Sequence, residues 1–174
     1  DAAPTQNWKK KSLKKGKLDV PENLIFAPIN FNKELIKDVL EKAGYESEKK
    51  TLFIWEGVSY YLEDESVNAT LGFVKEFAHP ESVIAFDYVL PLTTENENAF
   101  GVKKFFESMK KEHEAEALVF SIEEGGIKSF LEERGFRVIE HLDNEEIEKK
   151  FLTDHGSLLG QMTAHFRFVS ASRR

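Results

Sequence analysis

Four polar residues lie where predicted strands end, and they are the side chains best placed to bind a small ligand. They are Asp1, Asn30, Glu56 and Asp87. The carboxyl ends of parallel strands meet at one edge of a sheet, where open α/β sheets bind their ligands. We therefore expect these residues to line a single crevice. Two alternatives stay open: Glu56 is equally compatible with a solvated strand-to-helix turn, and Asp87 with a simple strand-end turn.

Two tyrosines follow Glu56 within one turn and extend this candidate site. Tyr60 and Tyr61 could each present a hydroxyl group to the crevice. The alternative for each ring is packing at the sheet edge, and we expect that for one of the two. The spacing alone does not distinguish them.

The sequence does not indicate other kinds of catalytic site. No two of the five histidines stand at i,i+4 with an acidic partner, so a metal site is not expected. The absence of cysteine excludes thiolate chemistry and disulfides, and it suits a reducing cytoplasm. There is no G-x-S-x-G motif and no phosphate-binding loop, and Gly125-Gly126 fits a helix-entry turn better than a nucleotide loop.

Length, charge and hydropathy restrict the class of protein. A chain of 174 residues with 41% hydrophobic and 32% charged residues fits one soluble domain. Its net charge of -7 argues against nucleic acid as a partner. Six lysines between Trp8 and Lys17 are best explained as a solvated helix face, with a phosphate-binding patch as the weaker alternative. No apolar run approaches the ~18 residues of a membrane span, so no membrane partner is expected.

The stretch Thr51–Leu62 (TLFIWEGVSYYL) organises the predicted fold. It opens as an apolar strand that we expect to be buried, and it stops at Glu56-Gly57. The elements around it alternate: a strand at Asn23–Ile29, a helix at Lys33–Ala43 capped by Asn32, this strand, a helix at Glu63–Phe77 and a strand at Ser82–Leu90. This order is typical of a parallel sheet.

The flanking segments predict how the sheet is completed. A helix is expected from Pro4 to about Lys15, before Gly16. After residue 90 we expect helices at Ala99–Glu114, Glu123–Arg134 and Asn144–Phe151, a strand at Phe136–His141 and a long final strand at Gln161–Ala171. A parallel sheet closed by a reversed strand resembles the Rossmann-like methyltransferases.

Four motifs sharpen this resemblance. They are D-A-A-P-T-Q-x-W-K from Asp1, F-A-P-I-N-F from Phe26, T-L-F-I-W-E-G-V-S-Y-Y-L from Thr51 and I-A-F-D-Y-V from Ile84. In this order they resemble the leucine carboxyl methyltransferase family, in its microbial branch of S-adenosylmethionine-dependent O-methyltransferases. The resemblance implies an α/β fold with sheet order 3-2-1-4-5-7-6. It implies that residues 1–174 are the C-terminal two-thirds of one methyltransferase domain, here without its first two strands.

The resemblance also implies cofactor contacts. Asp1 would hold the ribose hydroxyls of S-adenosyl-L-methionine, because a carboxylate accepts two hydrogen bonds from a diol. Asn30 and Phe31 would lie beside the adenine, although the family has aspartate at the position of Asn30. Glu56, followed by Gly57, would lie near the methionine moiety and its amino group.

The implied activity is methyl transfer to a carboxylate or hydroxyl oxygen of an unknown acceptor, a small molecule or a C-terminal carboxylate. Tyr61 matches the tyrosine that helps to hold the acceptor. The family's glycine-rich loop and substrate-side arginine are not found in these residues. The alternative is therefore a non-catalytic, truncated or domain-swapped interaction module that does not bind the cofactor alone. An unpaired strand at Asn23–Ile29 would favour a homo-oligomer.

Overall fold

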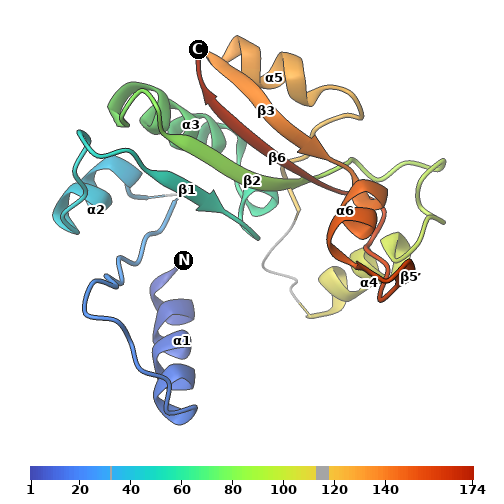
Figure 1. Ribbon diagram of the computed structural model, residues 1–174, viewed down its shortest axis with the longest axis horizontal. Helices are drawn as coiled ribbons and strands as arrows, with labels where there is room; N and C mark the ends of the chain where they lie inside the picture. The colour runs from blue at the N-terminus through green and yellow to red at the C-terminus, as the bar shows by residue number, and fades with distance from the viewer. Residues whose placement is uncertain (32, 113–117) are drawn as a thin grey trace.

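The computed structural model describes residues 1–31, 33–112 and 118–174, and its centre is a four-stranded mixed sheet (Figure 1). The strand order is β1-β2-β6-β3. β1 and β2 are parallel, whereas β6 is antiparallel to both β2 and β3. The bounds are Leu52–Trp55 for β1, Val83–Val89 for β2, Phe136–Leu142 for β3 and Phe166–Arg173 for β6. The reversed strand is thus confirmed, and the order agrees with positions 4-5-7-6 of the predicted sheet.

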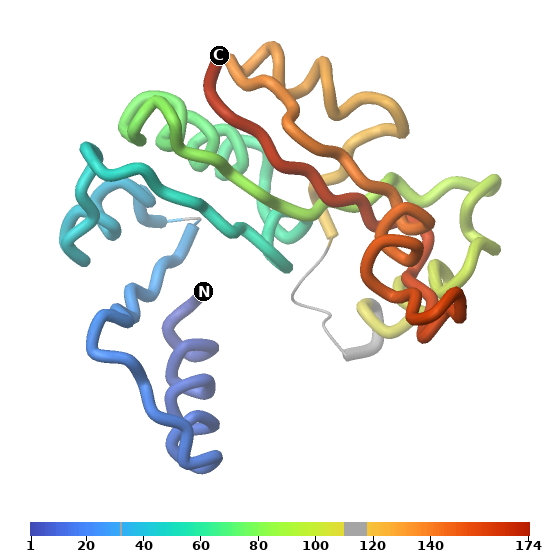
Figure 2. The backbone as a smooth tube through the Cα atoms, viewed as in Figure 1, coloured from blue at the N-terminus to red at the C-terminus, as the bar shows by residue number. Residues whose placement is uncertain are grey.

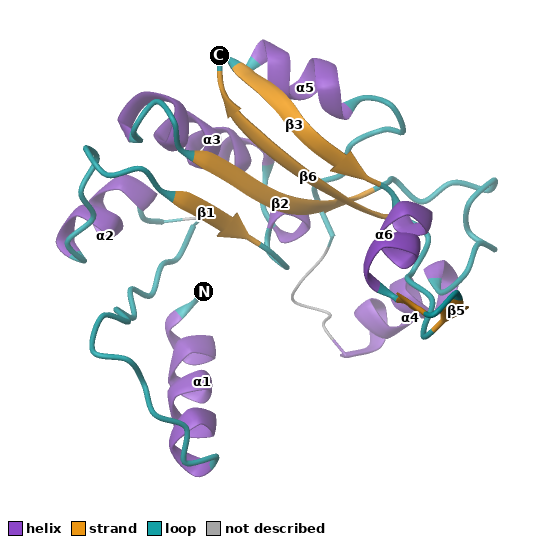
Figure 3. Cartoon of the chain, viewed as in Figure 1, coloured by secondary structure: helices purple, strands orange, loops and turns teal. Residues whose placement is uncertain are grey.

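The helices gather on one face of this sheet and at its ends (Figure 3). α3 and α5 pack against the face that carries the core, in which Leu71 and Leu131 are almost fully buried. The remaining elements are α1 (Ala3–Lys15), α2 (Ile36–Lys42), the 3₁₀ turn η1 (Ser59–Tyr61), α3 (Asp64–Phe77), α4 (Val102–Glu112), α5 (Ile127–Glu133), α6 (Asn144–Phe151) and the small hairpin of β4 (Thr153–Asp154) and β5 (Ser157–Leu158). None of the described helices is long and apolar enough to cross a bilayer.

The prediction that the strand of Thr51–Leu62 is buried is only half correct. Phe53 and Trp55 face the core, but Leu52 and Ile54 are 61% and 70% exposed. Successive side chains of a strand point to opposite faces. Because α3 covers only one face of β1, the other apolar pair remains open.

The predicted strand at Asn23–Ile29 is wrong. The segment is extended but irregular, and Leu24 and Ile25 are largely exposed. A strand is stabilised by a hydrogen-bonded neighbour, whereas the end of this segment is held by a bond from the Ile29 N–H to the Asp1 carbonyl at 3.0 Å. Figure 2 shows this segment running beside α1, apart from the sheet.

Several predicted boundaries move, while others hold. α2 begins three residues later than predicted, and Asn32, its predicted cap, lies outside the described residues. α5 begins at Ile127 and β6 at Phe166, so each is shorter than its pattern indicated. The predicted helix at Ala99–Glu114 corresponds to α4, and its last two residues also lie outside the described residues. α6 has its predicted bounds, because Asp143 and Glu146 form a complete capping box.

Candidate functional site

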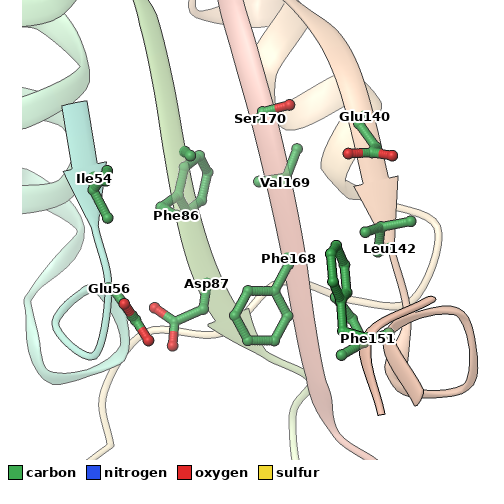
Figure 4. Close-up of a pocket in the computed structure, with 12 residues that line it drawn as sticks. Ile54, Glu56, Phe86, Asp87, Glu140, Leu142, Phe151, Phe168, Val169 and Ser170 are labelled. Carbon is green, nitrogen blue, oxygen red and sulfur yellow. The ribbon is translucent and has the colours of Figure 1, made fainter. Parts of the chain in front are cut away.

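Two carboxylates converge at the carboxyl ends of β1 and β2. Trp55 pairs with Phe86 in the parallel register, so the next residues of the two strands, Glu56 and Asp87, are neighbours. Figure 4 shows both side chains turned toward one another at one end of a pocket. Glu56 is exposed, whereas Asp87 is buried. These two residues therefore lie at the same edge of the sheet and line one pocket, while their role in binding a ligand stays a prediction.

The turn after β1 fixes Asp87. The Gly57 N–H donates to Asp87 Oδ1 at 2.9 Å, and the Ser59 hydroxyl donates to the Asp87 carbonyl. Burial raises the pKa of the Asp87 carboxyl and the Glu56 charge adds to this, while the Gly57 N–H acts in the opposite direction. Gly57 has φ of +69°, a left-handed conformation that favours glycine.

Glu56 also lines a second cavity, of about 320 Å³, which residues 53–56 of β1 and the turn after it border. Asp1 and Phe31 line the same cavity, so three of the predicted cofactor residues meet there although they come from separate segments. The Phe31 carbonyl accepts a hydrogen bond from the Ser66 hydroxyl of α3 at 3.2 Å, which holds Phe31 beside the sheet.

Asn30 does not itself line this cavity. It is exposed and lies between Ile29 and Phe31, which both line the cavity. Its backbone N–H donates to Glu34 Oε2 at 2.9 Å. The structure therefore brings the segment of Asn30 to the cavity, and the contact of its side chain with a ligand stays a prediction.

The pocket in Figure 4 lies on the uncovered face of the sheet and has a volume of about 300 Å³. Its floor and walls are mostly apolar, with Ile54, Phe168 and Phe151 among them. Its charged lining residues are Glu56, Asp87 and Glu140, all of them acidic. Glu140 pairs with Lys150 at 2.5 Å, which leaves the Glu56 end as the more negative one.

Tyr60 and Tyr61 differ in burial and in the side chains that they contact. Tyr60 is buried, with its ring against Phe166 at a centroid distance of 5.7 Å. Tyr61 is partly buried, and its hydroxyl lies 3.8 Å from the Met109 sulfur of α4. One tyrosine is therefore packed, as expected, and the site residue predicted at Tyr61 faces α4.

Sequence reasoning missed a buried polar group behind the rim. Arg167 of β6 donates to Glu124 at 2.6 Å and is only 8% exposed. The Tyr88 hydroxyl lies 3.0 Å from His141 Nε2, and burial raises the pKa of Tyr88. The sequence offered one indication of their burial: Arg167 and Tyr88 occupy inward-facing positions of the predicted strands. The first contact ties β6 to the loop before α5, and the second ties β2 to β3.

Comparison with known proteins identifies relatives. Residues 1–75 match the family described as leucine carboxyl methyltransferase. The chain is 30% identical over 168 residues to YktD of Bacillus subtilis (strain 168), a predicted S-adenosyl-L-methionine-dependent methyltransferase. The match covers 95% of this chain and 54% of YktD, so the chain spans about half the length of this curated relative.

Solved structures extend the likeness to the whole fold. The mitomycin 7-O-methyltransferase MmcR matches with a TM-score of 0.57 at 15% identity, over 100% of this chain and 40% of that one. TehB from Haemophilus influenzae matches with a TM-score of 0.53 at 12% identity, over 99% of this chain and 48% of that one. The chain therefore shares the Rossmann-like α/β fold of these two structures, and its residues 1–75 are similar to the leucine carboxyl methyltransferase family.

Proposed function

We propose that this chain binds S-adenosyl-L-methionine and takes part in methyl transfer to an oxygen of an acceptor. The observation that carries the proposal is the convergence of Asp1, Phe31 and Glu56 on one cavity. The name of the relative YktD supports the same cofactor. Most residues lining that cavity are apolar, so its two carboxylates would be its specific polar contacts.

The residues present fit this cofactor. The cavity offers a carboxylate for a diol at Asp1, an aromatic ring for a base at Phe31 and a carboxylate for a cationic end at Glu56. Gly57 would contribute by giving the chain the sharp turn that presents Glu56. Asn30 would reach the base from the segment beside Phe31.

When bound, S-adenosyl-L-methionine supplies an activated methyl group. In-line transfer of that group needs little proton transfer, so the protein contributes chiefly by alignment. Glu56 and Asp1 would fix the position of the donor. Tyr61, the last residue of the turn η1, has its hydroxyl beside the Met109 sulfur and would orient the carboxylate or hydroxyl of a small molecule or of a chain's C-terminus.

Calorimetric titration with S-adenosylhomocysteine tests this function. We expect the chain to bind, and Glu56→Gln to weaken binding about tenfold or more, because a hydrogen bond to a charged group contributes about 1.5–3 kcal/mol. Glu48→Gln, at an exposed position away from both cavities, is the matched control and should bind normally. Equal affinities of the two variants, or no binding by the unaltered chain, would contradict the proposal.

A second candidate function is an interaction module, and the edge of β1 favours it. Among the described residues β1 pairs only with β2, so its other edge leaves backbone groups available to a further strand. A second copy of the chain would then form a homo-oligomer. Light scattering across a hundredfold range of concentration tests this, and a monomer throughout would contradict it.

A further inference from the structure

The helix α1 presents an exposed face that is both basic and aromatic. Of its residues only Gln6 is buried, and Figure 1 shows the helix standing apart from the sheet. Trp8, Lys11 and Lys15 are spaced i, i+3 and i+7, so they lie on one side of the helix. All three are exposed, and Trp8 is 70% exposed. Tryptophan is among the residue types that most often anchor protein interfaces, so this face is suited to a partner.

A groove of about 580 Å³ between the start of α2 and α3 offers a surface of complementary shape. Its apolar walls include Leu35 and Phe77, which are 63% and 38% exposed. Ala69 and Gly72 of α3 line it between these walls. A Cβ atom placed on Gly72 would have no neighbour within 4 Å, so space is open above this residue. The groove can therefore accept a bulky side chain against α3.

The groove is acidic as well as apolar. Its charged lining residues are three glutamates and one lysine, namely Glu34, Glu65, Glu76 and Lys37. Glu65 and Glu76 are exposed, and they stand at the two ends of the stretch of α3 that carries the small residues. Positions i, i+4, i+7 and i+11 share one helix face, so both carboxylates lie on the side of α3 that borders the groove.

The face of α1 and the groove match in charge and in spacing. The helix α1 contains five lysines and no acidic residue. Seven residues separate Trp8 from Lys15, and seven separate Gly72 from Glu65. In antiparallel packing, Trp8 over Gly72 therefore brings Lys15 beside Glu65, since both helices rise about 1.5 Å per residue. Glu76 then lies near the first turn of α1, where the helix dipole favours a negative charge.

We propose that α1 of one copy of the chain binds in the groove between α2 and α3 of a second copy. The contact joins two different surfaces, so it is heterologous. It is separate from the cofactor site, because no residue of α1, and neither Glu65 nor Glu76, lines the cavity of Asp1 and Glu56. It also differs from pairing at the edge of β1, which would use backbone hydrogen bonds and not these charges.

Sedimentation velocity over a hundredfold range of concentration measures the self-association. We expect the unaltered chain to associate at low salt and to dissociate at about 1 M salt, where charges are screened within about 3 Å. The chain has two tryptophans, of which Trp55 is buried. A blue shift of tryptophan emission with rising concentration therefore reports burial of Trp8. Trp8→Ala should weaken association about tenfold or more, as expected for an aromatic anchor.

Two charge reversals test whether these surfaces meet each other. Lys11→Glu with Lys15→Glu should abolish self-association, and so should Glu65→Lys with Glu76→Lys, because each double variant brings like charges together. An equimolar mixture of the two double variants should associate again, since opposite charges then face one another across the two chains. Thermal unfolding of each double variant establishes that it is folded.

The matched control and the contrary outcomes separate the possible partners of α1. Lys103→Glu with Lys104→Glu, at exposed positions of α4, makes the same change of net charge and should associate as the unaltered chain does. A monomer at every concentration, association that survives both reversals, or a mixture that stays monomeric would each overturn the inference. An emission shift of Trp8 with anionic phospholipid vesicles, and not with protein concentration, would assign α1 to a membrane surface instead. Both charge-reversed variants should still bind S-adenosylhomocysteine, so failure of this contact leaves the proposed function standing.

Discussion

Residues 51–90 and residues 1–31 both supply candidate site residues, but they are held differently. The first segment is β1, α3 and β2, and its inward side chains form the core. The second segment has α1, of which only Gln6 is buried, and an irregular stretch tied to Asp1 by one backbone hydrogen bond. Glu56 and Asp87 therefore stand on packed structure, whereas Asp1 depends on a few local contacts. Phe31 lies between these cases, because it is bonded to Ser66 of α3 and packs against the edge of the core.

The largest expected effect is a core substitution in residues 51–90. Leu71 of α3 is 1% exposed, and Leu24 of the N-terminal segment is 47% exposed. We expect Leu71→Ala to lower the free energy of unfolding by about 2–5 kcal/mol, because it leaves a cavity. Leu24→Ala should change it by less than about 0.5 kcal/mol. Urea denaturation of both variants measures the two values, and similar losses would mean that the two segments are held alike.

His165 is expected to change the free energy of unfolding with pH, by an amount similar to the loss in Leu71→Ala. This histidine is 1% exposed between Phe105, Phe106 and Phe166, and burial, aided by Arg167, lowers its pKa to about 4. Between pH 6.5 and about 4 the unfolded chain binds a proton that the folded chain does not, so stability falls as pH falls through this window.

The contribution of His165 to the pH dependence of stability is measured as the difference in unfolding free energy between the unaltered protein and the His165→Phe variant. At about pH 7.5 the variant should be at least as stable, since it removes a buried polar ring without hydrogen-bond partners among the described residues. As pH falls to about 4.5, the variant should lose less stability than the parent. Parallel pH profiles would contradict the predicted shift.

A smaller effect is expected at the turn that carries the carboxylates. Gly57→Ala places a side chain at φ +69°, and we expect a loss of about 1–2 kcal/mol together with weaker S-adenosylhomocysteine binding. Gly72 of α3 has open space where a Cβ would lie, so Gly72→Ala should instead stabilise the protein by about 0.5–1 kcal/mol. Thermal unfolding measures the stability of both variants, and titration measures their binding of S-adenosylhomocysteine. Stability changes of the same sign in the two variants would contradict the prediction.

The smallest effect is expected at the N-terminal helix. Lys10 lies 4.8 Å from the centre of the Phe26 ring, at an exposed position. We expect Lys10→Ala to change the unfolding free energy by about 0.5–1 kcal/mol at most. Denaturation at low and high salt measures it. A loss comparable to that of Leu71→Ala would show that residues 1–31 are held by the core after all.

The sequence predicted those elements whose signals are local. α3, β2 and α6 follow from apolar spacing and from the Asp143 cap, which operate within one segment. Asn23–Ile29 had the composition of a strand, but a strand also needs a hydrogen-bonded neighbour, which composition does not supply. Likewise, the exposure of Leu52 and Ile54 depends on which face of the sheet the helices cover.

The sequence likewise predicted some residues of the candidate site and not others. Glu56 and Asp87 were placed on one rim because parallel strands end together. The distinction between Tyr60 and Tyr61 was not accessible, since adjacent residues of the 3₁₀ turn η1 point in different directions only once the turn is built. Arg167 and His165 were missed because their burial arises from packing between β6 and segments far from it in sequence.

The two outer edges of the sheet differ in how they resist aggregation. β3 has a register irregularity between Val138 and Glu140 and carries charged side chains, features that discourage edge-to-edge pairing. β1 presents only the residues LFIW, without a charge. The net charge of -7 keeps molecules apart at neutral pH, and this repulsion vanishes near the isoelectric point of about 5.4. Solubility should therefore reach its minimum near that pH, with β1 as the surface through which molecules first adhere.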